Sequence, residues 1–284
     1  MNILRKVKIG TVTLNNPLMT ASGTFGYGKE FADFMDLSIL GGIVTKTISV
    51  KPRGGNPSPR IYDLGYGVIN SIGLENPGVK AFKEQDADFC KTAKTRVFVS
   101  IYGLSPHEWK TLVNELNIPA VAGFELNFSC PNLQGKIAAY DRKKVASVIS
   151  RLRPLTNKPL IAKLSFCPHI TDVANAAQRA GADALTVINT LPAVAVDSAT
   201  GKFVLGNIYG GLSGPCIKPV ALKCVYDVSR TVSIPVIGCG GITQHTDVLE
   251  FIACGATAVQ IGTANITSPD AARRLVHDLT KHGK

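Results

Sequence analysis

A single cysteine, Cys130, stands between an apolar run and a Pro-Asn pair in the segment ELNFSCPNLQGK, residues 125–136. A thiol in this position could be a reactive group, a metal ligand or a small buried side chain. No two of the seven cysteines have the C-x-x-C spacing of zinc or iron–sulfur motifs, and their odd number argues against a disulfide framework. We therefore expect no metal site. We expect six cysteines to be reduced and buried: Cys90, Cys167, Cys216, Cys224, Cys239 and Cys254.

Two lysines also belong to apolar runs. Lys46 lies near the end of GIVTKT (42–47), and Lys163 lies in PLIAKL (159–164). A lysine buried in an apolar strand needs an anionic partner or a lowered pKa, which is costly without a use. We therefore expect both lysines to be buried and functional.

Two pairs of small residues follow apolar runs near the C-terminus. Gly240-Gly241 comes after IPVIGC (234–239), and Gly262-Thr263 comes at the end of TAVQIG (257–262). Such pairs also serve tight turns, but their bare backbone N–H groups can approach a phosphate closely. Together with the two lysines, they predict a phosphorylated cofactor.

Eight short apolar runs must position these residues. They are near-continuous rather than alternating, which is typical of parallel strands buried on both faces. Helix-like segments separate them; one at 105–117 opens with Ser105-Pro106, a cap followed by a first-turn proline. The pattern predicts an α/β fold, a (β/α)₈ TIM barrel forming one domain over residues 1–284. A doubly wound open sheet is the alternative, but no G-x-G-x-x-G follows the first run. The predicted strands are 17–22, 42–47, 97–102, 123–128, 159–164, 183–188, 234–239 and 257–262.

Two connections, 48–76 and 189–217, are longer than a barrel requires. Both follow the C-terminal end of a predicted strand, which is the active face of this fold. Because they are rich in Gly, Asn and Ser, we expect long loops that cover a functional site.

The formal net charge is +11, but the Lys and Arg residues are scattered. Short groups such as RKVK and DRKK lack interleaved aromatic residues, so we expect no nucleic-acid binding. The charge suits an anionic ligand and an acidic partner instead. The N-terminal MNILRKVKIG lacks a signal-peptide core, and no run of 18 apolar residues suggests a membrane span. We expect a cytoplasmic protein.

Several of these segments carry a family resemblance. NFSCPN, VINSIGLENPG, INTL, GGLSGPCIKPVAL, IPVIGCGGI and IGTAN resemble the class 1 dihydroorotate dehydrogenases, and the likeness runs from NPLMTASGTFG to IGTANI. GLENPG and GLSGP look most like the class 1B catalytic subunit. The resemblance implies an FMN-containing barrel that oxidises dihydroorotate to orotate in de novo pyrimidine biosynthesis.

The resemblance also assigns roles. Cys130 would be the base that takes the C5 proton while a hydride leaves C6 for flavin N5, since a thiol with a pKa of about 8.5 needs only modest depression to act near neutral pH. Lys163 would lie near flavin N1 and O2. Ser100 stands where the family commonly has Asn, so we expect one weaker flavin hydrogen bond. The implied flavin contacts are Ser22, Lys46, Thr47, Ser100, Asn127, Lys163, Ile188, Gly214, Gly240, Gly241, Gly262 and Thr263. The implied substrate contacts are Lys46, Asn70, Ser71, Ile72, Gly73, Leu74, Asn127, Asn132, Asn189 and Thr190.

Class 1B enzymes pair this barrel with a second subunit that holds FAD and an iron–sulfur cluster and reduces NAD. The resemblance thus implies a homodimer that joins electron-transfer subunits in a heterotetramer, and the cluster must come from that partner because this chain has no cysteine cluster. Loop 131–140 is expected to cover Cys130, and its LQGKIAAYD sequence is closer to class 1A.

Three alternatives stay open at this point. The enzyme could use fumarate as class 1A does, or it could be a flavin barrel like dihydropyrimidine dehydrogenase. A non-catalytic or nucleic-acid-binding barrel is the third, against which Lys46, Cys130 and Lys163 argue.

Overall fold

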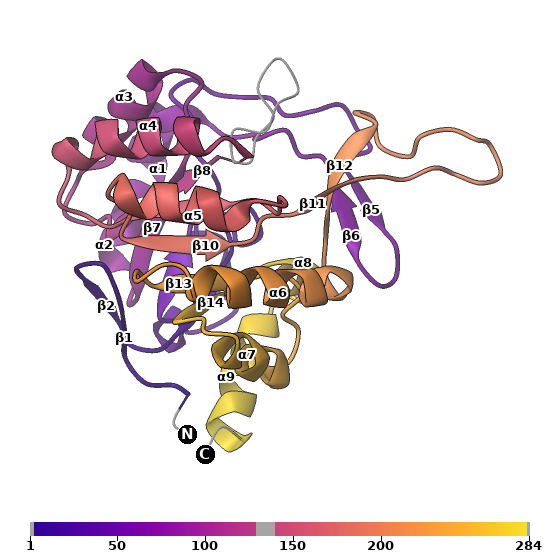
Figure 1. The fold of residues 1–284 in the computed structure, drawn as a ribbon. Helices are drawn as coiled ribbons and strands as arrows, with labels where there is room; N and C mark the ends of the chain where they lie inside the picture. The colour runs from indigo at the N-terminus through magenta and orange to yellow at the C-terminus, as the bar shows by residue number, and fades with distance from the viewer. Residues whose placement is uncertain (1–2, 129–139, 283–284) are drawn as a thin grey trace.

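Eight parallel strands close into a barrel in the computed structural model, which describes residues 3–128 and 140–282 (Figure 1). Their order around the barrel is β10-β13-β14-β3-β4-β7-β8-β9. Every strand falls within one residue of a predicted run, so the predicted barrel is confirmed. The strands are β3 (Leu18–Thr20), β4 (Gly42–Val44), β7 (Arg96–Ile101), β8 (Gly123–Asn127), β9 (Leu160–Leu164), β10 (Ala184–Val187), β13 (Val236–Cys239) and β14 (Ala258–Ile261).

The helices pack around the outside of the barrel. The helix predicted at 105–117 forms at α3, where the Ser105 side chain accepts a hydrogen bond from the Glu108 N–H. Within the described residues, no helix is both long and apolar enough for a bilayer. The helices are α1 (Gly78–Gln85), α2 (Ala87–Thr92), α3 (Pro106–Leu116), α4 (Arg142–Leu152), α5 (Ile170–Arg179), α6 (Lys218–Ser229), α7 (His245–Ala253), α8 (Thr263–Thr267) and α9 (Ala271–His282).

The first strand–helix unit differs from the prediction. The chain passes from β3 to β4 through two 3₁₀ turns, η1 (Lys29–Phe31) and η2 (Leu37–Ile39), with no α-helix in this fully described segment. Gly23, Gly26 and Gly28 all have positive φ, which breaks helical geometry at the start of the connection. The prediction of eight strand–helix units is therefore wrong for this unit.

The interior of the barrel is apolar at one end and polar at the other. The apolar end is closed by the hairpin of β1 (Val7–Ile9) and β2 (Val12–Leu14), whose Ile9 and Leu14 are fully buried. Successive side chains of a strand alternate between the faces, so inward positions recur every second residue. The apolar layer holds Met19, Val44, Phe98, Ile161, Ala184, Ile237 and Ala258. Two residues further along four of these strands come Ser100, Lys163, Thr186 and Gln260.

The two long connections do more than cover the barrel mouth. Residues 48–76 contain β5 (Ile61–Asp63) and β6 (Val68–Asn70), and residues 189–217 contain β11 (Leu191–Val194) and β12 (Tyr209–Ser213). They form one four-stranded antiparallel sheet in the order β11-β12-β6-β5, from which an arm between β11 and β12 extends (Figure 1). Each loop therefore holds the other in place beside the mouth.

Candidate active site

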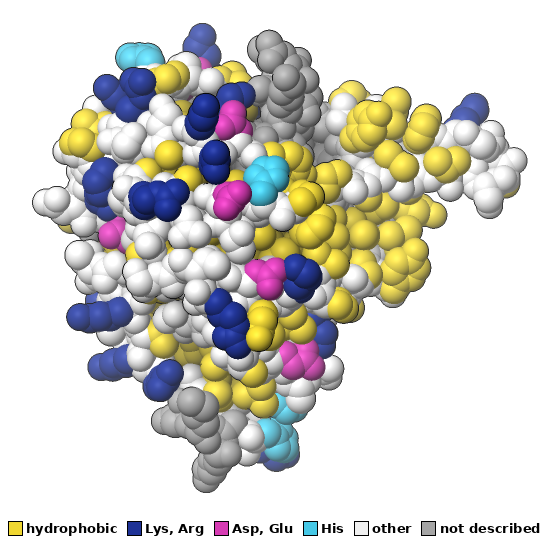
Figure 2. Space-filling model, viewed as in Figure 1, with side chains coloured by type: hydrophobic (Ala, Val, Ile, Leu, Met, Phe, Trp, Pro, Cys, Tyr) yellow, Lys and Arg dark blue, Asp and Glu magenta, His cyan; other side chains and the backbone are white. Residues whose placement is uncertain are grey.

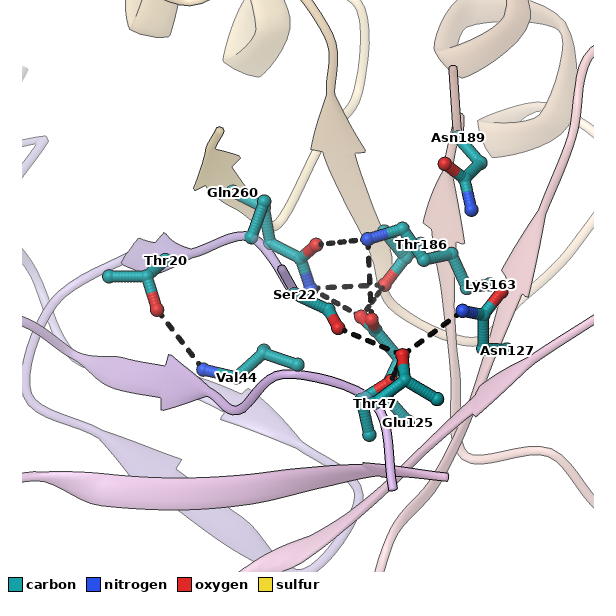
Figure 3. A network of polar contacts seen from close by, with 12 residues as sticks. Thr20, Ser22, Val44, Thr47, Glu125, Asn127, Lys163, Thr186, Asn189 and Gln260 are labelled. Atoms are coloured by element: carbon teal, nitrogen blue, oxygen red, sulfur yellow. Dashed lines mark hydrogen bonds and ion pairs between the residues drawn. The ribbon is translucent and has the colours of Figure 1, made fainter. Parts of the chain in front are cut away.

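A buried carboxylate organises the polar end of the barrel. Glu125 on β8 is fully buried, and its two oxygens accept hydrogen bonds from three other strands (Figure 3). Lys163 Nζ lies 3.3 Å from one oxygen, while Thr186 Oγ1 and Gln260 Nε2 lie 3.0 and 2.6 Å from the other. Lys163 Nζ also donates to Gln260 Oε1 at 3.2 Å. Glu125 is thus the anionic partner that a buried Lys163 requires.

The pairing decides the charge of Lys163. Burial alone lowers the pKa of its ammonium, but the charge and hydrogen bond of Glu125 outweigh burial and leave the pKa raised. Lys163 therefore keeps its positive charge at physiological pH. Burial raises the pKa of the neighbouring Cys239 thiol, which stays neutral.

A second group of polar side chains surrounds Thr47. The Thr47 hydroxyl accepts a hydrogen bond from Asn127 Nδ2 at 3.1 Å, and it lies 2.8 Å from Ser100 Oγ and 3.2 Å from Ser22 Oγ. Thr47, Ser100 and Asn127 are buried. Asn127 follows Glu125 by two residues on β8 and so shares its face (Figure 3). The structure thus brings four predicted cofactor contacts into one cluster.

Lys46 differs from Lys163. Its side chain is 29% exposed, and its ammonium lies 4.0 Å from the Glu75 carboxylate. The prediction that Lys46 is buried is wrong, because β4 ends at Val44 and Lys46 lies beyond the strand, at the barrel mouth.

Asn70, at the end of β6, and the predicted substrate residues 71–74 that follow it lie on and beside the four-stranded sheet. Asn70 Nδ2 donates to the Gly211 carbonyl at 3.3 Å, and Ser71 Oγ donates to the Tyr209 carbonyl at 2.9 Å. The backbone then turns through left-handed positions at Gly73 and Leu74. A left-handed leucine is unusual, so this turn is held by its surroundings. Ile72 accepts a backbone hydrogen bond from Asn56.

Three predicted residues directly follow β10. Ile188 is buried and donates its N–H to the Cys239 carbonyl. Asn189 Oδ1 accepts the Thr190 N–H at 2.7 Å, and Asn189 is drawn beside the network in Figure 3. Thr190 packs so closely on Gly211 that a side chain there would meet its hydroxyl. The residues after β10 therefore join the barrel mouth to the sheet that carries Asn70.

The two residue pairs of the predicted phosphate site, Gly240-Gly241 and Gly262-Thr263, meet beside a third turn that contains Gly214. Gly214, Gly240 and Gly241 all have positive φ. A Cβ on Gly241 would lie 3.0 Å from the Gly214 carbonyl, and a Cβ on Gly214 would lie 3.7 Å from Thr263 Cγ2. Gly262 precedes α8, which begins at Thr263. The turns after β12, β13 and β14 thus lie close together, with little room for side chains beside Gly240 and Gly241. We call these turns the glycine cradle, and their backbone N–H groups suit a phosphate group.

Two predicted site residues, Cys130 and Asn132, fall outside the described residues, as does most of loop 131–140.

The other six cysteines are described and are all free. Among them, Cys216 is exposed and Cys254 is partly exposed. The prediction that all six are buried is therefore wrong, because Cys216 lies in a turn between Pro215 and α6 rather than in an apolar strand.

Sequence reasoning missed Glu125, Thr186 and Gln260. Each is a polar residue between two apolar neighbours inside a strand, and Glu125 lies two residues before the predicted Asn127. That alternation was a usable signal, because two residues along a strand return to the same face. The alternation alone does not specify which strands face one another across the barrel.

Comparison with known proteins identifies the family. Residues 4–282 match the family model described as dihydroorotate dehydrogenase. The chain belongs to the dihydroorotate dehydrogenase family. It is 48% identical to the dihydroorotate dehydrogenase B (NAD(+)), catalytic subunit, of Geotalea uraniireducens over 96% of this chain and 91% of that protein. It is 46% identical to the same subunit of Geobacter sulfurreducens over 97% of this chain and 92% of that one.

A solved structure agrees in fold. The crystal structure of DHODH in complex with ferulenol from Eimeria tenella has a TM-score of 0.80 and covers 98% of this chain and 85% of its own. At 23% identity it supports the barrel fold. The present chain, as a member of this family, is an FMN-dependent oxidoreductase. Its glycine cradle and the fixed charge of Lys163 fit that cofactor.

We predict that Glu125→Gln destabilises the cofactor-free protein. The substitution leaves a buried ammonium without its carboxylate, so we expect the free energy of unfolding to fall by about 3–5 kcal/mol in urea denaturation. Because the pKa of Lys163 is raised, the contribution of the pair is complete below the ordinary pKa of lysine and is lost only at more alkaline pH. The loss should therefore be equal at about pH 7 and about pH 9.

The matched control is Lys223→Met, which breaks an exposed pair with Asp227 on α6. It should cost no more than about 0.5 kcal/mol. A loss of similar size in both variants would contradict the importance of the buried pair.

Proposed function

We propose that the chain removes a proton from C5 and a hydride from C6 of dihydroorotate and so forms orotate for de novo pyrimidine biosynthesis. FMN, when bound, supplies the acceptor for the hydride. The observation that carries this proposal is the fixed positive charge of Lys163 beside the cluster around Thr47, in a chain of this family. We take residues 1–284 as one FMN-binding domain that works in the cytoplasm, and the six free cysteines support a reducing compartment.

The proposed role of Lys163 is electrostatic stabilisation of the reduced flavin. A cation held near N1 and O2 of the isoalloxazine stabilises the negative charge that develops there on reduction. The hydrogen bonds from Lys163 to Glu125 and Gln260 support this role, because they fix the ammonium before the reaction begins. Ser22, Thr47, Ser100, Asn127 and Ile188 are the proposed flavin neighbours, and the glycine cradle with Thr263 is the proposed phosphate site.

The proposed substrate-binding groups are asparagine side-chain amides and the Lys46 ammonium. Asn70, Asn127, Asn132 and Asn189 can both donate and accept, which suits the amide groups of the dihydropyrimidine ring. The remaining proposed contacts are Ser71, Ile72, Gly73, Leu74 and Thr190. The partly exposed ammonium of Lys46 supports a contact with the substrate carboxylate or the flavin.

Cys130 is the proposed base that takes the C5 proton, on the strength of the SCPN motif. We predict that Cys130→Ser still binds FMN but reduces it at least about a hundredfold more slowly with dihydroorotate at neutral pH, because a hydroxyl is a far weaker base. Anaerobic stopped-flow spectroscopy of the flavin absorbance measures this step. Reduction at the wild-type rate would remove Cys130 from the mechanism.

We propose that the electrons then pass to NAD through a partner subunit that carries FAD and an iron–sulfur cluster. The relatives named above are called catalytic subunits of an NAD(+) enzyme, which supports a separate electron-transfer subunit. Fumarate as acceptor and dihydrouracil as substrate are the competing possibilities for this site.

We predict that the isolated chain, once reduced by dihydroorotate, does not reduce NAD until the partner subunit is added. Fumarate should reoxidise the flavin no faster than buffer does, and dihydrouracil should not reduce it. Flavin absorbance under anaerobic conditions follows all three steps. Rapid turnover with fumarate would favour the class 1A-like alternative, and reduction by dihydrouracil would favour the dihydropyrimidine dehydrogenase-like one.

We further propose that two copies of the chain form the core of a heterotetramer. Large apolar side chains are exposed around the four-stranded sheet and its arm, including Tyr62, Val194, Phe203 and Tyr209. Figure 2 shows hydrophobic side chains gathered at the base of the arm, while Lys and Arg gather over the helices. An exposed apolar patch of this kind is typical of an interface.

We predict that Tyr209→Glu converts the dimer to a monomer in sedimentation velocity experiments, because it places a charge in the apolar patch. Phe34→Glu is the control, since Phe34 is similarly exposed but lies in the β3–β4 connection. A dimer that survives Tyr209→Glu would locate the interface elsewhere.

A further inference from the structure

A buried carboxylate holds the turn that follows β13. Asp247, in the first turn of α7, is 2% exposed. Its Oδ2 accepts hydrogen bonds from the Thr243 N–H, the Thr243 hydroxyl and the Gln244 N–H at 2.8, 3.1 and 2.9 Å. These donors come directly after Gly240-Gly241 and Ile242. One carboxylate oxygen therefore fixes the far side of the glycine turn.

The other oxygen of Asp247 joins this turn to α6. Lys218, the first residue of α6, donates to Asp247 Oδ1 at 2.6 Å, and its ammonium also lies 2.7 Å from Glu250 Oε2. The backbone of Lys218 touches the same turn, because a Cβ on Gly241 would lie 2.9 Å from the Lys218 nitrogen. A Cβ on Gly240 would lie 2.9 Å from the Ala221 Cβ. The start of α6 thus packs directly on both glycines.

Both partners are charged at neutral pH. Hydrogen bonds to Asp247 and Glu250 raise the pKa of Lys218. Burial works to raise the pKa of Asp247, but the hydrogen bonds from Lys218, Thr243 and Gln244 outweigh it and leave that pKa lowered. The Lys218 ammonium is held between two carboxylates, so it acts through the turn rather than as a ligand of an anion.

We propose that the Asp247–Lys218 pair positions the Gly240-Gly241 turn so that its backbone N–H groups can bind the FMN phosphate. Neither residue is catalytic, and the proposal rests on the placement of the phosphate in the glycine cradle under the proposed function. The physical reason is that two glycines with positive φ lose much conformational freedom on folding, and a turn fixed in advance binds an anion without that loss.

The test compares FMN with riboflavin, which lacks the phosphate. In Lys218→Met and Asp247→Asn, the dissociation constant of FMN should rise about tenfold or more, since a positioned anion contact is weakened. The dissociation constant of riboflavin should change less than about twofold. Quenching of flavin fluorescence on binding to the cofactor-free protein measures both. Lys218→Arg keeps the charge and should restore most of the FMN affinity.

The control is again Lys223→Met, on the same helix but paired with the exposed Asp227; it should alter neither ligand. Equal weakening of FMN and riboflavin, or no change in either, would overturn the proposal by reducing the pair to a structural role. If Asp247→Asn does not fold, Lys218→Met decides, because it leaves the turn hydrogen bonds of Asp247 in place.

Failure of this proposal can be told apart from failure of the proposed function. Dihydroorotate added to wild-type protein saturated with FMN tests the reaction, whatever the Asp247–Lys218 pair does. Wild-type protein that binds FMN no more tightly than riboflavin would overturn the positioning role even if the reaction proceeds.

Discussion

The rest of the site depends on one buried ion pair, between Glu125 and Lys163 in the centre of the barrel. Two charges removed from water are costly, and only close contact and complete hydrogen bonding make them tolerable. Thr186 and Gln260 complete the hydrogen bonding of the carboxylate, so the full network depends on the register of four strands. The Lys163 cation is thereby held in a fixed position at the polar end of the barrel.

The apolar end of the barrel contributes to the stability of the fold, and the polar end carries the candidate site. The apolar layer below the ion pair packs against the hairpin that buries Ile9 and Leu14, and this packing closes that end of the barrel. Around that mouth, two long connections pair with each other through β6 and β12 and carry Asn70 and Gly211 into contact. Asn70 thus stands on a small sheet instead of on a free loop, so its position is fixed in advance.

The glycine cradle likewise differs from the side chains that support it, Asp247 and Lys218. The cradle uses glycines because Lys218 and the Gly214 carbonyl approach Gly241 too closely for a side chain. Asp247, which is buried, contacts the Gly240-Gly241 turn from the side of α6 and α7 through its hydrogen bonds to Lys218 and Thr243. The buried carboxylates Glu125 and Asp247 therefore have similar roles. Glu125 fixes Lys163 inside the barrel, and Asp247 fixes Lys218 beside the glycine cradle.

The sequence by itself determined the barrel and which predicted site residues follow its strands. Near-continuous apolar runs located all eight strands, because strands buried on both faces leave little room for polar residues. Ser22, Thr47, Ser100 and Asn127 could be predicted from family motifs, and they meet in the structure. The missing first helix could not be foreseen from strand–helix counting, since three glycines with positive φ act locally against it.

Only the tertiary structure decided which of these residues touch. Lys46 and Lys163 look alike in the sequence, yet one stands at the mouth and the other is buried against Glu125, because strand length and barrel closure set their depth. The pairing of β6 with β12 and the contact of Lys218 with Asp247 join segments far apart along the chain. Local patterns specify the face on which a side chain lies, but its partner depends on how the whole chain closes.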